Sequence, residues 1–324
     1  MKKIVFYIGV SVLILSGLIT VLIFNKNNEI EHINSSVVYI ESVDSKTIKS
    51  GSGFVYKENN DNTYIITSYH VIEGYNDIYV YSNNKEKIKA EIAGFDEYTD
   101  IAVLSINNNL DLKEISFGDS DKVSVNDKIY VVGTPTNIEN INTKVSGIIS
   151  NNNKEITINT THGSSKLETI EVSVKVDYGN SGGPVLNVKH EVIGMMFVKD
   201  EISINKGYAL PINFVIDIAS KLINNELKRP NLGAIMCNTT NLELLNQHAI
   251  SIDDINGVVI LEVKERGLLY NLGLQKGNII TKFDGKEINN VNELREQLYK
   301  NEIGDKVNIE YYKDGGYHKV DIEL

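Results

Sequence analysis

Between Ser35 and Gly207 the chain is a succession of short runs of β-branched and aromatic residues, separated by clusters of asparagine, aspartate and glycine. Runs of roughly four to eight such residues between turn-forming residues are typical of strands. A long series of short strands predicts a sandwich or a barrel. The clearest of these runs are Val37–Ile40, Tyr64–Thr67, Ile78–Tyr81 and Ile129–Val132.

The pattern changes at Pro211. Residues 212–227, INFVIDIASKLINNEL, place apolar side chains on one face of a helix, which predicts an amphipathic helix. Pro211 suits a position at or just before the first helical turn, where its missing N–H costs nothing. Lys228–Pro230 has the composition of a helix end followed by a linker. The apolar face comprises Phe214, Val215, Ile218, Ala219, Leu222 and Ile223.

Residues 231–324 have the features of a second unit, in keeping with a length of 324 residues, which suggests about two domains. Gly257–Leu261 is typical of a strand, and Leu294 and Leu298 suit one face of a short amphipathic helix. Turn-forming residues at Asp314–Gly316 separate two further strand-like runs, which predicts a closing hairpin.

An uncharged run extends from Ile4 to Phe24, directly after Lys2 and Lys3. A helix over this run would span roughly 32 Å, about the hydrocarbon thickness of a bilayer. We expect an uncleaved anchor, with the two lysines on the cytoplasmic side by the positive-inside rule. A cleaved signal peptide is the alternative, but the run ends in Leu22-Ile23-Phe24 without the small residues of a cleavage site. Both interpretations place the bulk of the protein outside the cytoplasm.

The composition limits the kinds of partner and cofactor that we expect the protein to bind. The net charge of −11 argues against a nucleic-acid partner, because phosphate binding needs clustered lysine and arginine. Cys237 is the only cysteine, so no intrachain disulfide is predicted, and we expect it to act as a small buried apolar residue. The histidines are scattered and match neither the HExxH nor the CxxC pattern, so neither a metal nor an organic cofactor is expected.

The stretch DYGNSGGPVLN, residues 177–187, surrounds Ser181 with three glycines and a proline. It is either a tight turn between strands or a segment that presents one hydroxyl for chemistry. A serine hydroxyl is a poor nucleophile unless a base adjoins it. The base in turn needs an acid that fixes its tautomer. The interpretation therefore depends on a suitable histidine and aspartate elsewhere in the chain.

Both partners are present. His70 follows the apolar run Tyr64–Thr67, so it is predicted at the exit of a strand. Asp100 adjoins another apolar run, which predicts partial burial, and a buried carboxylate needs a donor such as an imidazole N–H. The backbone N–H groups of Gly179 and Ser181 could together stabilise a developing oxyanion, worth about 100- to 1,000-fold in rate each.

Three segments occur in the order His, Asp, Ser: TSYHVIEG (67–74), YTDIAVL (98–104) and YGNSGGPVLN (178–187). They resemble the HtrA (DegP-type) family of chymotrypsin-fold serine proteases. The later segments GVVILEV, GLQKGNIITKFDGKEI and NELREQL resemble the PDZ domain that follows the protease in that family. The resemblance covers nearly the whole chain after residue 35. It implies a mostly β fold, with a chymotrypsin-like double β-barrel followed by a PDZ domain.

The resemblance also implies roles. It makes the chain a serine endopeptidase with His70 as general base, Asp100 as its orienting acid and Ser181 as nucleophile, while Gly179 and Ser181 supply the oxyanion hole. The alternative is a non-catalytic, chaperone-like peptide-binding protein. The presence of all three triad residues argues against this alternative. The implied organisation is a cytoplasmic tail (1–3), a transmembrane signal anchor (4–24), a linker (25–34), a protease domain (35–227) and a PDZ domain (228–324).

Two departures from the family bear on specificity. Lys175 stands six residues before Ser181, where related proteases line the base of the S1 pocket. It either favours acidic P1 residues or points to solvent, and we favour solvent because an unpaired lysine is seldom buried. By resemblance Met195, Met196 and Phe197 form the pocket wall, and their bulk suggests a shallow apolar pocket.

The PDZ resemblance assigns a peptide site to Leu232, Gly233 and Ala234, where an extended C-terminus would add a strand to a sheet edge. The alternative is that this stretch is only a linker strand. The resemblance further implies polypeptide substrates and a homo-oligomer, trimeric in the family. Together with the apolar N-terminal run, it implies a single-pass protein of the cell membrane with both domains extracytoplasmic. General quality control and a dedicated sensor protease with one substrate both remain open.

Overall fold

The computed structural model describes residues 31–59, 61–107, 110–134, 141–160, 163–175, 178–199, 205–252 and 254–324. These residues fall into two compact units, one holding two β-barrels and one holding a smaller sheet. The predicted membrane-spanning run Ile4–Phe24 lies outside the described residues. Within them, no helix is both long enough and apolar enough to cross a membrane.

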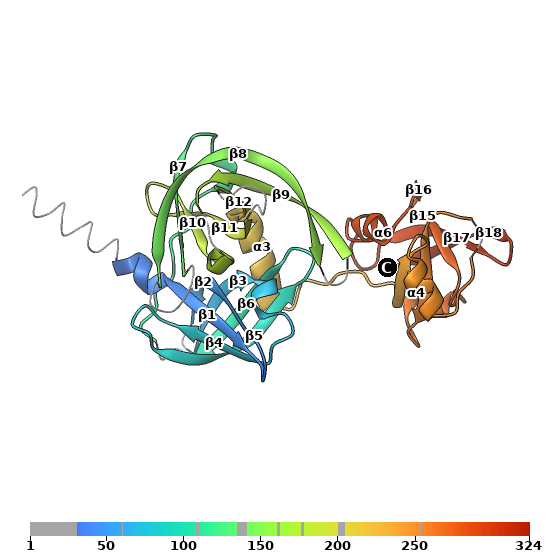
Figure 1. Cartoon of the computed structure of the whole chain (residues 1–324), viewed down its shortest axis with the longest axis horizontal. Helices are drawn as coiled ribbons and strands as arrows, with labels where there is room; N and C mark the ends of the chain where they lie inside the picture. The colour runs from blue at the N-terminus through green and yellow to red at the C-terminus, as the bar shows by residue number, and fades with distance from the viewer. Residues whose placement is uncertain are drawn as a thin grey trace, which may run out of the picture. The chain divides into compact units, whose positions relative to one another are not determined.

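The first barrel is a closed, antiparallel arrangement of six strands in the order β1-β2-β3-β6-β5-β4 (Figure 1). Its interior is filled by β-branched and leucine side chains such as Val38, Ile65 and Leu104, each 0% exposed. Closure pairs the strand edges, so the barrel leaves no long open edge. The strands are β1 (Val37–Val43), β2 (Ile48–Glu58), β3 (Asn62–Ser68), β4 (Asp77–Tyr81), β5 (Lys87–Asp96) and β6 (Ile101–Asn107).

The second barrel has the same design, with strand order β10-β11-β12-β9-β8-β7. Ile129, Val172 and Met196 are among the buried side chains of its core. A 3-10 turn, η1 (Ser120–Lys122), lies between the two barrels in sequence. The strands are β7 (Lys128–Gly133), β8 (Thr143–Thr160), β9 (Gly163–Ser173), β10 (Pro184–Leu186), β11 (Val192–Lys199) and β12 (Lys206–Pro211). The predicted double-barrel fold is confirmed.

The predicted amphipathic helix is α3 (Ile212–Ile223), which packs against β5 and β6 of the first barrel and β11 of the second. Val215, Ile218 and Leu222 are buried, as the spacing predicts. The helix ends at Ile223, the last residue of the apolar face and before the helix end expected at Lys228–Pro230. Asn225 has a φ of 56°, a left-handed conformation that cannot continue the helix and that asparagine tolerates.

The second unit is a six-stranded antiparallel sheet with three short helices. Its order is β13-β14-β15-β17-β18, and β16 pairs with β15. Asn290 caps α6, because its side chain accepts the N–H of Glu293. The elements are β13 (Ala234–Asn238), α4 (Leu242–Gln247), β14 (Val258–Val263), α5 (Leu268–Asn271), β15 (Ile279–Phe283), β16 (Lys286–Glu287), α6 (Val291–Leu298), β17 (Lys306–Lys313) and β18 (Gly316–Glu323).

Candidate active site

His70 lies in α2 (Tyr69–Ile72), a single helical turn that begins directly where β3 ends. Val71 and Ile72 are buried in the core of the first barrel and hold this turn against the strands. The His70 side chain is 38% exposed, so it lies away from that core. The imidazole is therefore carried by a rigid strand exit and remains accessible.

Asp100 holds the α2 turn through three hydrogen bonds. Its Oδ2 atom lies 2.6 Å from Nδ1 of His70, and its Oδ1 atom accepts the backbone N–H of His70 at 2.7 Å. The Asp100 carbonyl accepts the N–H of Tyr69 at 2.9 Å. A carboxylate at Nδ1 keeps a proton on that nitrogen, which leaves Nε2 as the atom that can accept one.

The backbone of Asp100 is unusual. Its φ is 56°, in the left-handed region that aspartate tolerates better than most residues. The residue is only 5% exposed, as the adjoining apolar run predicts. The left-handed turn allows the carboxylate and the carbonyl of one residue to reach α2 together.

Tyr69, the residue before His70, belongs to an aromatic pair. Tyr69 stacks on Phe95 with ring centroids 4.7 Å apart and an interplanar angle of 13°. Burial raises the pKa of Tyr69 to about 12, and the negative charge of Glu97 adds to the shift. The Tyr69 phenol is therefore uncharged at physiological pH.

Ser181 follows a 3-10 turn, η3 (Tyr178–Asn180), and precedes β10. Its carbonyl accepts the N–H of Ser52, in β2 of the first barrel, at 2.9 Å. Gly182 donates to the carbonyl of Met196 at 2.7 Å, and Met196 donates to the carbonyl of Gly183 at 2.8 Å. Backbone bonds to both barrels thus hold the serine segment at Ser181, Gly182 and Gly183.

Gly182 shows why the segment is rich in glycine. Its φ is 80°, and a Cβ atom there would lie 2.5 Å from Oγ1 of Thr67 and 2.8 Å from the backbone nitrogen of Ser68. Ser68 is two residues before His70. The fold therefore packs the serine segment against the end of β3, directly before the α2 turn that carries His70. Among the described residues, no hydrogen bond joins the Ser181 hydroxyl to His70; such catalytic bonds are often long until a substrate is bound.

Comparisons with known proteins agree with this geometry. A family model described as a trypsin-like peptidase domain matches residues 51–195, and a PDZ domain model matches residues 230–324. The serine protease Do-like HtrA of Lactococcus lactis subsp. lactis (strain IL1403) is 30% identical over 287 residues, which cover 85% of this chain and 70% of the relative. This chain belongs to the HtrA family of serine proteases. It is a serine-type endopeptidase with a PDZ domain.

Further relatives and solved structures are consistent with this assignment. The serine protease Do-like HtrB of Bacillus subtilis (strain 168) is 33% identical over 272 residues, which cover 82% of this chain and 59% of the relative. A crystal structure of the serine endoprotease from Yersinia pestis matches with a TM-score of 0.60 and 22% identity, covering 92% of this chain and 96% of that chain. The HtrA-type protease AlgW, solved with a decapeptide, matches with a TM-score of 0.59 and 21% identity, covering 92% and 97%. At these identities the structures show the shared fold.

The residues assigned to the specificity pocket of this HtrA-family chain lie in two different environments. Lys175 is exposed in the segment after β9. Met195, Met196 and Phe197 lie in β11 and are 0%, 2% and 4% exposed. Met196 packs into the core of the second barrel. Their contribution to a substrate pocket stays a prediction.

The residues assigned to PDZ peptide binding lie around the start of β13, which pairs along one edge with β14 and ends the sheet. Leu232 is 2% exposed and belongs to the core, and Ala234 begins the strand. Gly233 has a φ of 71°, and a Cβ atom there would lie 2.7 Å from the Cα of Gly267. Its N–H donates to Oδ1 of Asn231 at 2.7 Å. An edge strand of this kind can accept an added peptide strand.

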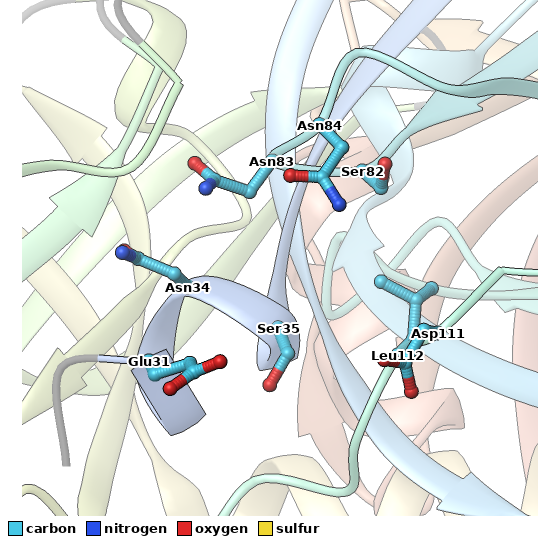
Figure 2. Close-up of a pocket in the computed structure, with 8 residues that line it drawn as sticks. All are labelled: Glu31, Asn34, Ser35, Ser82, Asn83, Asn84, Asp111 and Leu112. Atoms are coloured by element: carbon cyan, nitrogen blue, oxygen red, sulfur yellow. The ribbon is translucent and has the colours of Figure 1, made fainter. Parts of the chain in front are cut away.

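The cavity shown in Figure 2 lies elsewhere in the protease unit. It has a volume of about 420 Å³ and is bordered by the turn after β4 and by the segment after β6. Neither His70, Asp100 nor Ser181 lines it. Its lining is mostly polar and consists of Glu31, Asn34, Ser35, Ser82, Asn83, Asn84, Asp111 and Leu112.

The sequence motifs did not indicate two residues that hold the serine segment. Ser52 in β2 and the backbone of Met196 in β11 both bond to it. One signal was present, because Gly51 and Gly53 flank Ser52, and glycine within a strand often marks a close backbone approach. A Cβ atom at Gly51 would lie 3.1 Å from the carbonyl oxygen of Ser181.

Proposed function

We propose that this chain hydrolyses peptide bonds through an acyl-enzyme formed at Ser181. The observation that carries the proposal is the bond between Nδ1 of His70 and Oδ2 of Asp100, 2.6 Å long, on a turn that lies against the serine segment. This pair supplies a base whose Nε2 is free to take a proton. A nucleophile, a base and an orienting acid are the parts that this chemistry needs.

In the proposed reaction, Oγ of Ser181 attacks the scissile carbonyl carbon while Nε2 of His70 takes the hydroxyl proton. The carbonyl oxygen becomes an oxyanion that the N–H groups of Gly179 and Ser181 stabilise. When the tetrahedral intermediate collapses, the C–N bond breaks and His70 gives its proton to the leaving amine. A water molecule then attacks the ester in the same way and releases the acid and Ser181. Asp100 holds the imidazole throughout.

We infer that the substrates are extended polypeptides, exposed or misfolded, and that the PDZ unit binds peptide ends along β13. The support is the terminal position of β13 in its sheet and the family membership of the chain. Binding of this kind uses main-chain hydrogen bonds for affinity and side-chain pockets for selectivity. Alanine scanning of a bound C-terminal peptide would test it, because only the last few residues should matter for affinity.

We further propose that the chain forms a homo-oligomer. We also propose that Ile4–Phe24 anchors the protein in the cell membrane, with both domains on the extracytoplasmic side. The support for the anchor is the length of the uncharged run and the lysines before it. The full-length protein should remain in the membrane fraction after alkaline extraction and be digested by protease added to spheroplasts. Release by alkali, or protection in spheroplasts, would contradict the anchor or its orientation.

Labelling with a fluorophosphonate probe tests the catalytic proposal directly, because the probe reacts only with an activated serine. We expect labelling of the wild type and none of Ser181→Ala or His70→Ala. His318→Ala is the matched control, because His318 is exposed on β18 in the other unit. Labelling that persists in Ser181→Ala would place the nucleophile elsewhere. Absence of labelling in the wild type, together with retained peptide binding, would favour the non-catalytic alternative.

A further inference from the structure

Ser52 belongs to the first barrel, but its hydroxyl serves the second. The residue lies in β2 and is 0% exposed. Its Oγ atom donates to the carbonyl oxygen of Gly179 at 2.7 Å and accepts the N–H of Thr134 at 2.9 Å. Gly179 lies in η3, and Thr134 follows the end of β7. One hydroxyl therefore bridges two separate loops of the second barrel.

The backbone of Ser52 extends this connection to the triad. Its N–H donates to the carbonyl of Ser181 at 2.9 Å, and its carbonyl accepts the Thr67 hydroxyl at 2.8 Å. Thr67 lies in β3, three residues before His70. Ser52 thus bonds to both residues assigned to the oxyanion hole, Gly179 through its side chain and Ser181 through its backbone.

The packing around Ser52 leaves its hydroxyl little freedom. A Cβ atom at Gly133 would lie 2.8 Å from Oγ of Ser52 and 2.7 Å from Oδ1 of Asn180, so glycine is needed there for close approach. Asn180 itself is 3% exposed. The Ser52 hydroxyl is therefore enclosed on the Gly133 side, within hydrogen-bond distance of the Gly179 carbonyl.

We propose that Ser52 is a positioning residue that holds the oxyanion-binding segment in register with the catalytic histidine. The inference rests on the proposed acyl-enzyme function. Oxyanion donors act only when they are placed where the charge develops, and small displacements are costly. Removal of the hydroxyl would leave the buried Gly179 carbonyl and Thr134 N–H without their partner, and the segment would shift to satisfy them.

The expected signature is a loss of transition-state stabilisation with little change in substrate binding. An interaction of that kind lowers kcat and leaves KM nearly unchanged. We expect Ser52→Ala to lower kcat by about tenfold to 100-fold. This fall is no larger than the fall in kcat that removal of one oxyanion donor causes. A peptide boronic acid, whose tetrahedral adduct mimics the intermediate, should bind more weakly by the same factor as the fall in kcat/KM.

Ser42→Ala is the matched control. Ser42 is also a fully buried serine of the first barrel, on β1, and its hydroxyl has no hydrogen-bond partner among the described residues. The experiment measures kcat, KM, the boronic acid Ki and the melting temperature of the full chain, with a fluorogenic peptide that the wild type cleaves. Ser42→Ala should match the wild type in all kinetic constants.

Ser52→Cys distinguishes the effect of losing the hydrogen bonds from the effect of losing side-chain volume. It also replaces Ser52→Ala in the experiment if Ser52→Ala does not fold. Cysteine keeps a similar shape with a much weaker donor, so we expect a fall in kcat in the same direction. Unchanged kcat in a folded Ser52→Ala or Ser52→Cys variant, or a raised KM with unchanged kcat, would overturn the inference. If Ser181→Ala retains wild-type activity, both the proposed function and the inference about Ser52 are wrong. Loss of activity in Ser181→Ala with wild-type kinetics in Ser52→Ala removes the inference alone.

Discussion

The Cα atom of Gly182 faces the carbonyl oxygen of Ser52 so closely that a Cβ atom does not fit between them. Ser52 belongs to the first barrel and Gly182 to the segment that carries Ser181. The contact is therefore a point at which the two barrels meet next to the nucleophile. Side-chain volume at position 182 would push the serine segment away from β2 and β3.

Gly182→Ala should lower both activity and stability for this reason. The substitution adds a left-handed strain of about 1–2 kcal/mol and a clash with Ser52 and Thr67. Gly74→Ala is the control for the strain alone, because Gly74 has a φ of 82° and nothing within 4 Å of its Cβ position. We expect a lower melting temperature for Gly182→Ala than for Gly74→Ala, measured by thermal denaturation. Equal melting temperatures would mean that the contact contributes nothing.

Asp100→Asn should leave the fold intact and lower kcat by roughly 1,000- to 10,000-fold, the order seen when a triad aspartate is replaced by its amide. An amide N–H₂ facing Nδ1 of His70 favours the tautomer with its proton on Nε2, which then cannot accept the serine proton. Asp96→Asn, at a buried carboxylate that accepts the Thr99 hydroxyl at 2.7 Å, is the matched control. Steady-state kinetics beside circular dichroism decide the matter, and near-normal kcat in Asp100→Asn would refute the assigned role.

Gly233→Ala should weaken peptide binding by the PDZ unit at least tenfold. The new methyl group would meet the backbone of Gly267 and displace the stretch at the start of β13. Gly285→Ala is the control, because Gly285 has a nearly equal φ of 73° and open space around its Cβ position. Fluorescence polarisation with a labelled C-terminal peptide gives the affinities. Similar affinities for the two variants would place the peptide site elsewhere.

Asp119 should contribute a small, acid-labile part of the stability of the protease unit, because its carboxylate and the Lys122 ammonium are both exposed to solvent. Hydrogen bonds from Lys122, Asn213 and the N–H of Asp121 lower the pKa of its carboxyl from 3.8 to about 2. Because the folded pKa is lowered, the stabilisation is fully present above pH 4 and is lost as the pH falls toward 2. Asp119→Asn should therefore be less stable than the wild type at neutral pH, and the gap in melting temperature should shrink between pH 4 and pH 2. A gap that does not change with pH would exclude this carboxylate as its source.

Several features of the fold followed from local pattern. Runs of β-branched residues predicted strands, and the apolar spacing after Pro211 predicted α3, because burial on one face imposes a period on the sequence. The exit of β3 at Ser68 placed His70 at a strand end, as expected. The helix end expected at Lys228–Pro230 was wrong, because Asn225 adopts a left-handed conformation, and the amino-acid pattern after Ile223 does not record that backbone choice.

The sequence alone determined which residue types are available for chemistry, since His70, Asp100 and Ser181 carry the family motifs in order. Only the tertiary structure decided what holds them. Ser52 and the backbone of Met196 bond to the Ser181 segment across long distances in sequence. Every non-proline residue carries the same backbone donor and acceptor, so their pairing leaves almost no trace in the sequence. Local periodicity shows that a residue is buried, whereas its partner is decided by how the two barrels pack.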